Sequence, residues 1–146
     1  MVNVGYAMVG LHNPKNSLNV GSAMRAVGVY GAAGLIVSGK RLGSDQTDTM
    51  KHYRHIPLLR VDDIFDALAY DCIPVAVDKV PGAIPLPYYK HPQRALYIFG
   101  AEDSTLGKKT LQRCREAICV PMDGCMNLAA SVNVVLYDRL AKGMLQ

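Results

Sequence analysis

The sequence lacks the features that mark several specialised classes of protein. It has no tryptophan, no C-x-x-C pair, and no apolar run near the roughly 20 residues that a membrane-spanning helix requires. Its first residues show neither the basic start nor the long apolar core of a secretory signal peptide. We therefore expect a cytoplasmic protein. We expect no metal, because no cysteine pair is placed to complete a zinc site with His52 and His55.

The cysteines are few and lie in or beside apolar runs, at Cys72, Cys114, Cys119 and Cys125. Free cysteine is among the most buried residue types, so we expect reduced thiols packed within the fold.

The chain also lacks a large excess of one charge, because its 16 basic and 12 acidic residues give a net charge of only +4. The basic residues nevertheless gather in two segments, 40–60 and 108–115, whereas the aspartates of segment 62–78 have no base among them. Two basic segments in a nearly balanced chain indicate a surface that contacts a polyanion. On charge alone, ordinary solvated surface explains them as well.

The pattern of apolar residues predicts a single α/β domain over residues 1–146. Half of the 146 residues are hydrophobic, which allows a real core without disulfide or metal support. Short apolar runs, typical of strands, occur near residues 2–8 (ending at Gly10), 35–37, 73–77, 95–99 and 117–120. Because segments of helical period separate these runs, we expect a parallel sheet with helices on both faces.

Helix signals follow several of the strands. Residues 20–27 have helical spacing, with Ser17 or Asn19 available as N-cap and Gly31 as a stop. Asp62 and Asp63 suit the first turn of another helix, and a helical apolar stripe spans residues 128–140.

Ligands of such sheets bind beyond the carboxyl ends of the strands, which here are expected to carry Gly10, Gly39, Asp78, Gly100 and Met122. The pattern N-x-G-x-x-x-R at Asn19, Gly21 and Arg25 opens the first helix. The glycine permits close approach of a ligand, and the arginine suits a phosphate or a carboxylate. A capped helix with a surface arginine would produce the same pattern.

Two further segments follow strands. Phe99-Gly100-Ala101-Glu102 places a carboxylate beyond a glycine, although a tight turn with a capping acid is an alternative. Residues 120–128 join the last strand to the last helix, where Asn127 could be a plain N-cap. No P-loop lysine and no G-x-G-x-x-G pattern occurs, so phosphate-cradling nucleotide chemistry is unsupported.

In this order, the three segments resemble the three motifs of the SpoU/TrmH family of RNA 2′-O-methyltransferases, in the SPOUT superfamily. The resemblance runs from about Val2 to Leu140, and the short length is similar to that of minimal members, including tRNA wobble-position enzymes. It implies an α/β fold with a deep C-terminal trefoil knot, an obligate homodimer, and S-adenosylmethionine bound in the knot. The implied substrate is RNA, with tRNA expected first and rRNA second.

The resemblance also implies roles for single residues. Arg25 would be catalytic, with Asn19, Glu102 and Asn127 arranging the site. Because a guanidinium stays protonated at neutral pH, we expect Arg25 to clamp a phosphate and stabilise a developing alkoxide. The cofactor would contact Val77, Gly100, Val120, Met122, Cys125 and Met126, mostly through the main chain.

RNA contacts would come from the basic segments, at Arg41, Lys51, Arg54 and Lys108. The chain departs from the family pattern at Thr105, where a glycine is usual, and at Cys125 and Ala129, where serines are usual. The departures at Thr105 and Ala129 keep open an alternative, a catalytically silent dimer that binds RNA or cofactor without transferring methyl groups.

Overall fold

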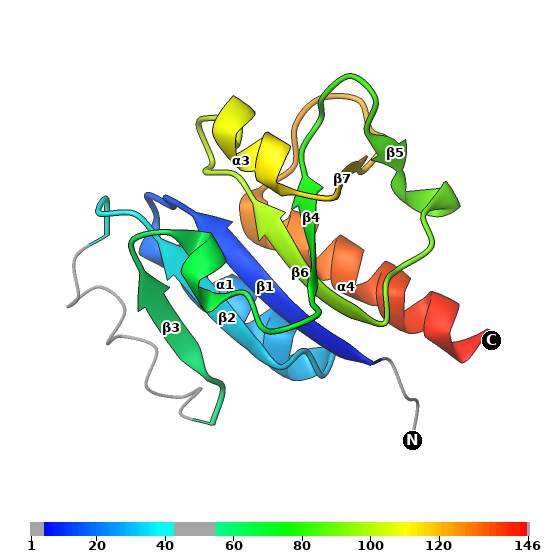
Figure 1. The fold of residues 1–146 in the computed structure, drawn as a ribbon, viewed down its shortest axis with the longest axis horizontal. Helices are drawn as coiled ribbons and strands as arrows, with labels where there is room; N and C mark the ends of the chain where they lie inside the picture. Colours follow the sequence, from blue (N-terminus) through cyan, green and yellow to red (C-terminus); the bar gives the residue numbers. More distant parts are fainter. Residues whose placement is uncertain (1–4, 43–54, 146) are drawn as a thin grey trace.

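The apolar runs form one seven-stranded parallel sheet in the computed structural model, which describes residues 5–42 and 55–145 (Figure 1). The strands are β1 (Tyr6–His12), β2 (Gly34–Ser38), β3 (Leu58–Val61), β4 (Ile73–Val77), β5 (Ile84–Pro85), β6 (Arg94–Phe99) and β7 (Glu116–Cys119). Their order is β3-β2-β1-β6-β4-β7-β5, and every pairing is parallel.

Both faces of the sheet are buried, as continuous apolar strands predict. Tyr97 of β6 belongs to the apolar cluster that includes α1 (Ser17–Val29) and α4 (Leu128–Met144). Its neighbours Leu96 and Ile98 belong to a second cluster, with the 3₁₀ helix η2 (Ile64–Ala67) and with α3 (Lys108–Arg113). The expected parallel sheet with helices on both faces is therefore confirmed (Figure 1).

Strand β1 does not end at Gly10, as the sequence pattern indicated, but continues to His12. Gly10 lies inside the strand because η2 packs closely over it, and a Cβ at this position would lie 2.6 Å from Ile64 Cδ1. The glycine therefore serves helix–sheet packing rather than a turn.

The helix after the two aspartates is shorter than expected, a single 3₁₀ turn at Ile64–Ala67. Asp63 caps this turn by accepting a hydrogen bond from the Phe65 amide. The N-cap of α1 is Asn16, not Ser17 or Asn19, and its side chain accepts from the Leu18 amide at 2.8 Å. Gly31 follows the helix with φ +71°, the left-handed conformation that favours glycine at a stop.

The four cysteines are free thiols, but only Cys72 is buried and Cys125 is exposed, so the expectation of packed thiols is wrong for Cys125. No helix of the described residues is both long enough and apolar enough to span a membrane. The C-terminal trefoil knot and the extent of the domain stay predictions.

The long connection between β4 and β6 contains β5 and the 3₁₀ helix η3 (Leu86–Tyr88). Because all strands are parallel, the loops that follow β1, β2, β4, β6 and β7 leave from one edge of the sheet. We call this side the carboxyl edge, and the three sequence motifs lie there.

Candidate functional site

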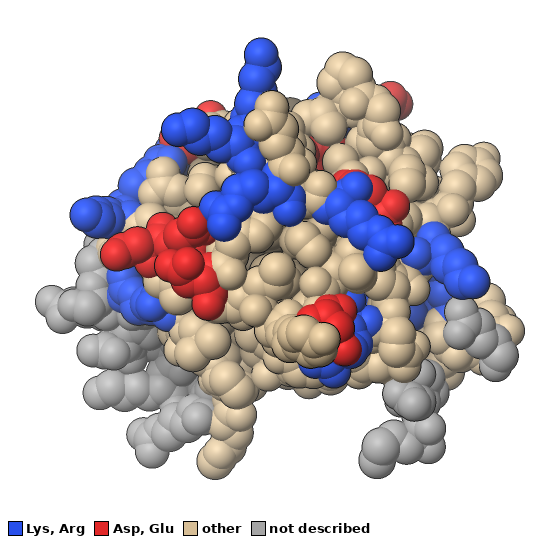
Figure 2. Space-filling view, in the orientation of Figure 1, with Lys and Arg blue, Asp and Glu red and all other residues tan. Residues whose placement is uncertain are grey.

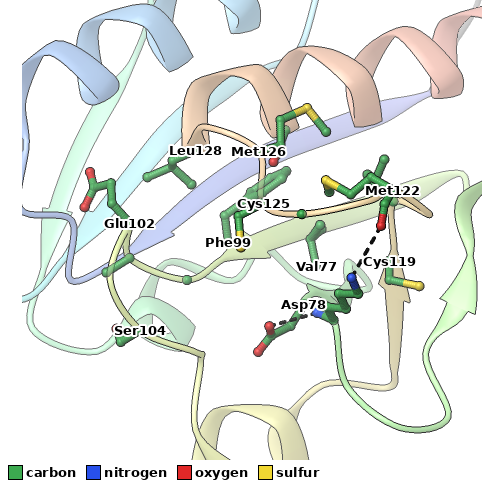
Figure 3. A pocket seen from close by; sticks show the side chains of 16 residues that line it. Val77, Asp78, Phe99, Glu102, Ser104, Cys119, Met122, Cys125, Met126 and Leu128 are labelled. Carbon is green, nitrogen blue, oxygen red and sulfur yellow. Dashed lines mark hydrogen bonds between the residues drawn. The ribbon is translucent and has the colours of Figure 1, made fainter.

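A pocket opens at the carboxyl edge where the neighbouring strands β6, β4 and β7 end (Figure 3). It has a volume of about 210 Å³ and lies between the strand ends and the first turns of α4. All six residues expected to contact a cofactor line it, namely Val77, Gly100, Val120, Met122, Cys125 and Met126.

The wall of the pocket is mostly apolar. Val77, Phe99 and Leu128 contribute side chains, and three connecting loops contribute main chain (Figure 3). The loop after β6 folds tightly over Gly100, where a Cβ would lie 3.1 Å from the Ser104 carbonyl oxygen. A larger residue at Gly100 would push this loop away from the strand end.

Three motif residues that are far apart in sequence form one hydrogen-bond network beside the pocket. The Asn19 side-chain amide donates to Glu102 Oε1 at 2.9 Å, and its carbonyl oxygen accepts from Asn127 Nδ2 at 2.9 Å. Asn127 Oδ1 in turn accepts from the amides of Ala129 and Ala130, which caps α4. The network thus joins α1, the loop after β6 and the first turn of α4.

Glu102 is held as a carboxylate. Partial burial raises its pKa, but hydrogen bonds from Asn19 and from backbone amides outweigh this effect and leave the pKa below its ordinary value. One of those amides is Lys15 N, which donates to Oε2 at 3.1 Å. Both carboxylate oxygens therefore have fixed partners and the group has a defined orientation.

Two residues outside the three sequence motifs connect the loops around the pocket. Asp78 accepts from the Lys79 amide at 2.9 Å and from the Leu106 amide at 3.1 Å. Lys79 Nζ contacts the Met122 carbonyl oxygen at 3.4 Å (Figure 3). The sequence does offer one signal for this site, an aspartate that directly follows a buried strand. Asp78 lies where the loops after β4, β6 and β7 meet.

The departure at Thr105 is accommodated without backbone strain. Thr105 is exposed and does not adopt a positive φ, and the next residue, Leu106, is buried. A positive φ occurs instead at Gly107, at +83°, directly before α3. The loop thus keeps its buried leucine and places its glycine two positions later.

Arg25 is not among the described residues that line the pocket of its own chain. It is exposed on α1, six positions after Asn19 and hence about 120° away from it around the helix axis. It shares an exposed stripe with Leu18, Ser22 and Val29. The fold therefore joins three of the four expected catalytic-site residues and separates the fourth.

The residues expected to bind RNA have different surroundings. Arg41 forms a two-pronged ion pair with Asp103, with N–O distances of 3.0 and 2.9 Å. Lys108 is exposed at the start of α3. Lys51 and Arg54, with His52, lie outside the described residues.

Comparison with solved structures agrees on the fold. The SpoU methyltransferase AviRb of Streptomyces viridochromogenes, determined in complex with AdoMet, superimposes with a TM-score of 0.83 and 21% identity over 99% of this chain and 59% of that chain. A structure determined to study the 2-OH methylation of C/U34 on tRNA superimposes with a TM-score of 0.82 and 21% identity, covering 98% of this chain and 99% of that one.

Among curated sequences, a protein of Archaeoglobus fulgidus described as an uncharacterized tRNA/rRNA methyltransferase is 24% identical over 151 residues, or 91% of this chain and 63% of that protein. The chain thus spans less than two thirds of this relative and of AviRb. The model of the SpoU rRNA Methylase family matches residues 6–137, which include all three motifs. By this match, the chain belongs to the SpoU rRNA Methylase family.

Proposed function

We propose that this protein is an S-adenosylmethionine-dependent RNA methyltransferase that methylates a ribose 2′-hydroxyl, with tRNA as its substrate. The observation that carries the proposal is the network of Glu102, Asn19 and Asn127 at the rim of a pocket built by the second and third motifs. The preference for tRNA is supported by the structural neighbour studied for 2-OH methylation of tRNA, whose length this chain nearly equals.

The pocket suits S-adenosylmethionine in its chemistry. Apolar side chains from β4, β6 and α4 offer a surface for a flat base, and the tight turn at Gly100 brings main-chain groups close. When bound, the cofactor supplies an electrophilic methyl group. Val77, Gly100, Val120, Met122, Cys125 and Met126 are the residues that we propose to hold it.

The protein must then orient a weak nucleophile, a ribose hydroxyl, toward the pocket. Glu102, fixed by Asn19 and the Lys15 amide, offers an oriented carboxylate at the rim. A guanidinium does not act as a base at neutral pH, so the role that we propose for Arg25 is to bind a neighbouring phosphate and to stabilise negative charge that develops on the attacking oxygen.

Arg25 can perform this role if two chains associate. Its stripe on α1 also carries Leu18 and Val29, which are 76% and 68% exposed, so this face of the helix offers apolar surface to a partner. We propose that this face packs against a second copy of the chain, and that Arg25 of one protomer serves the pocket of its partner.

The alternative of a silent RNA- or cofactor-binding dimer is favoured by Cys125 and Ala129, which replace the usual serines in the third motif. Cys125 is exposed in the pocket wall, and Ala129 is buried at the start of α4. This alternative predicts cofactor binding without methyl transfer, and rRNA is the second candidate substrate for the active enzyme.

The deciding experiment incubates the protein with radiolabelled S-adenosylmethionine and with total tRNA or rRNA, and then maps 2′-O-methyl groups. We expect label in tRNA. Arg25→Ala should abolish it, whereas Arg94→Ala, at the opposite edge of the sheet, should retain it. Cofactor binding with no label in any RNA would establish the silent dimer, and full turnover by Arg25→Ala would refute the assigned role.

A further inference from the structure

Three charged side chains from three loops meet at the rim of the site, next to Glu102. Arg41, after β2, donates from both terminal nitrogens to the two carboxylate oxygens of Asp103, after β6. Lys15, before α1, places its ammonium nitrogen 3.7 Å from the same carboxylate. Two cations thus converge on one anionic group.

This arrangement matches the way proteins hold phosphate. A guanidinium donates two parallel hydrogen bonds equally well to the oxygens of a carboxylate or of a phosphate. The Lys15 backbone amide, which donates to Glu102, fixes the position of the loop that carries the second cation. A phosphate in the place of the Asp103 carboxylate would therefore lie beside the candidate catalytic carboxylate.

The Asp103 carboxylate in this ion pair can also be replaced by another anion at little cost. Side chains of Lys15, Arg41 and Asp103 are 52%, 32% and 44% exposed, so water screens their attraction and the cluster contributes little to stability. The hydrogen bonds from Arg41 lower the pKa of Asp103 to about 2, so its negative charge persists at neutral pH.

The surface charge is consistent with cations that are neutralised by neighbouring carboxylates. Acidic and basic side chains lie next to each other on the face shown, rather than in one basic patch (Figure 2). At this rim, Lys15 and Arg41 are balanced by Asp103 and Glu102, so the local formal charge is zero. RNA gains attraction here only if a phosphate replaces Asp103.

We propose that Lys15 and Arg41 form a binding site for a backbone phosphate of the RNA substrate, and that Asp103 occupies this site until the phosphate displaces it. This inference rests on the proposed function and adds a regulatory part to it. Asp103 acts as an internal counter-ion, and any RNA phosphate that binds to Lys15 and Arg41 must compete with it.

The test measures the dissociation constant of an unmodified tRNA transcript, at several salt concentrations, for wild type and Asp103→Asn. Removal of the competing charge should tighten binding by about threefold to fivefold. The matched control is Asp71→Asn, which removes one negative charge from an exposed ion pair with Arg94 at the opposite edge of the sheet. It should change the dissociation constant much less.

A double-mutant cycle shows whether Asp103 acts through the proposed cations. Arg41→Ala should weaken binding and reduce the slope of log affinity against log salt by about one phosphate contact. In the Arg41→Ala background, Asp103→Asn should increase the affinity for tRNA by a smaller factor than in the wild-type background. Thermal unfolding of each variant checks that the fold persists.

Two results would overturn the proposal. Weaker binding by Asp103→Asn would mean that the carboxylate positions Arg41 instead of masking it, and equal gains for Asp103→Asn and Asp71→Asn would reflect net charge alone. In both cases wild-type methyl transfer to tRNA would be intact, so the proposed function would stand. A wild type that neither binds nor methylates RNA would refute both.

Discussion

At the scale of single residues, the site depends on the two-sided chemistry of one amide. Asn19 donates to Glu102 and accepts from Asn127, and only a side-chain amide offers a donor and an acceptor at this length. It is buried, at 8% exposure, so a lost partner would not be replaced by water without cost. Asn19 thereby fixes the position of α1 relative to the other two motifs.

Substitution of Asn19 by aspartate is the sharpest test of this network. Asn19→Asp keeps the shape but sets a second carboxylate against Glu102, so we expect methyl transfer to fall by at least about tenfold and unfolding free energy by about 1–3 kcal/mol. Asn16→Ala is the control, since loss of the α1 cap should cost about 1 kcal/mol and spare activity. Methyl transfer by Asn19→Asp at the wild-type rate would show that the network is merely structural.

Asp78 provides a second test at this scale, through the shape of the pocket. Asp78→Ala removes the acceptor that fixes the Leu106 amide, and we expect affinity for S-adenosylhomocysteine to fall about fivefold to tenfold. Asp66→Ala, at an exposed position of η2, should leave the affinity unchanged. Titration calorimetry measures the affinity of both variants. An unaltered affinity in Asp78→Ala would show that Asp78 does not position the loops of the pocket.

At the scale of elements, α4 is fixed at both ends. Asn127 caps its start, and near its end the buried Arg139 donates to the Tyr97 hydroxyl and to the Pro92 and Gln93 carbonyl oxygens. His91 adds a further link, with one ring nitrogen 2.6 Å from the Tyr97 hydroxyl and the other 2.7 Å from Asp138. Since an ionised carboxylate only accepts, the nitrogen facing Asp138 carries the proton.

This link makes stability depend on pH. Burial, together with the nearby charges of Lys142 and Arg139, lowers the pKa of His91 more than Asp138 raises it, so the unfolded chain, with a pKa near 6.5, binds a proton more readily than the folded one. Stability should therefore fall as the pH drops through about 6.5, and level off below the folded-state pKa. His12, whose pKa burial also lowers, should contribute with the same sign.

Chemical denaturation at several pH values between about 5 and 8 measures the effect. His91→Gln should be less stable at neutral pH, but its free energy of unfolding should depend less on pH. His12→Gln measures the contribution of His12 separately. A profile for His91→Gln as steep as that of wild type would assign the pH dependence to other groups.

The sequence predicted the elements whose signal is local, and it missed those that tertiary contacts decide. Apolar runs located β1, β2, β4, β6 and β7, because strands buried on both faces need continuous hydrophobicity. The two-residue β5 has no such run, and the end of β1 was misplaced because Gly10 serves contact with Ile64. The N-cap of α1 was misassigned because the Asn19 side chain is used in tertiary hydrogen bonds.

The same distinction applies to the site. The resemblance supplied the pocket residues, since these occupy fixed places in motifs. The partners of Asp78 and Arg41 lie 28 and 62 positions away, at Leu106 and Asp103, and no local pattern could indicate them. The network of Asn19, Glu102 and Asn127 likewise required the fold to show that the three side chains meet.

At the scale of the whole molecule, the proposed dimer would complete the site. Val29→Glu places a charge on the exposed stripe of α1, so we expect light scattering to report a monomer that has lost methyl transfer. Affinity for S-adenosylhomocysteine should fall little, because the pocket lies within one chain. Tyr70→Glu, a matched change at a residue that is 92% exposed, should remain dimeric and active. A dimeric, fully active Val29→Glu would place the interface elsewhere.

The order of the strands also has a consequence for how the chain is made. Strand β1 lies between β2 and β6, and Tyr6 pairs with Arg94, so the centre of the sheet closes only after most of the chain has left the ribosome. Contacts so distant in sequence form slowly, and until they form the apolar edge of β1 is open to other chains. We therefore expect folding yield to depend on synthesis rate and on chaperones more than native stability would indicate.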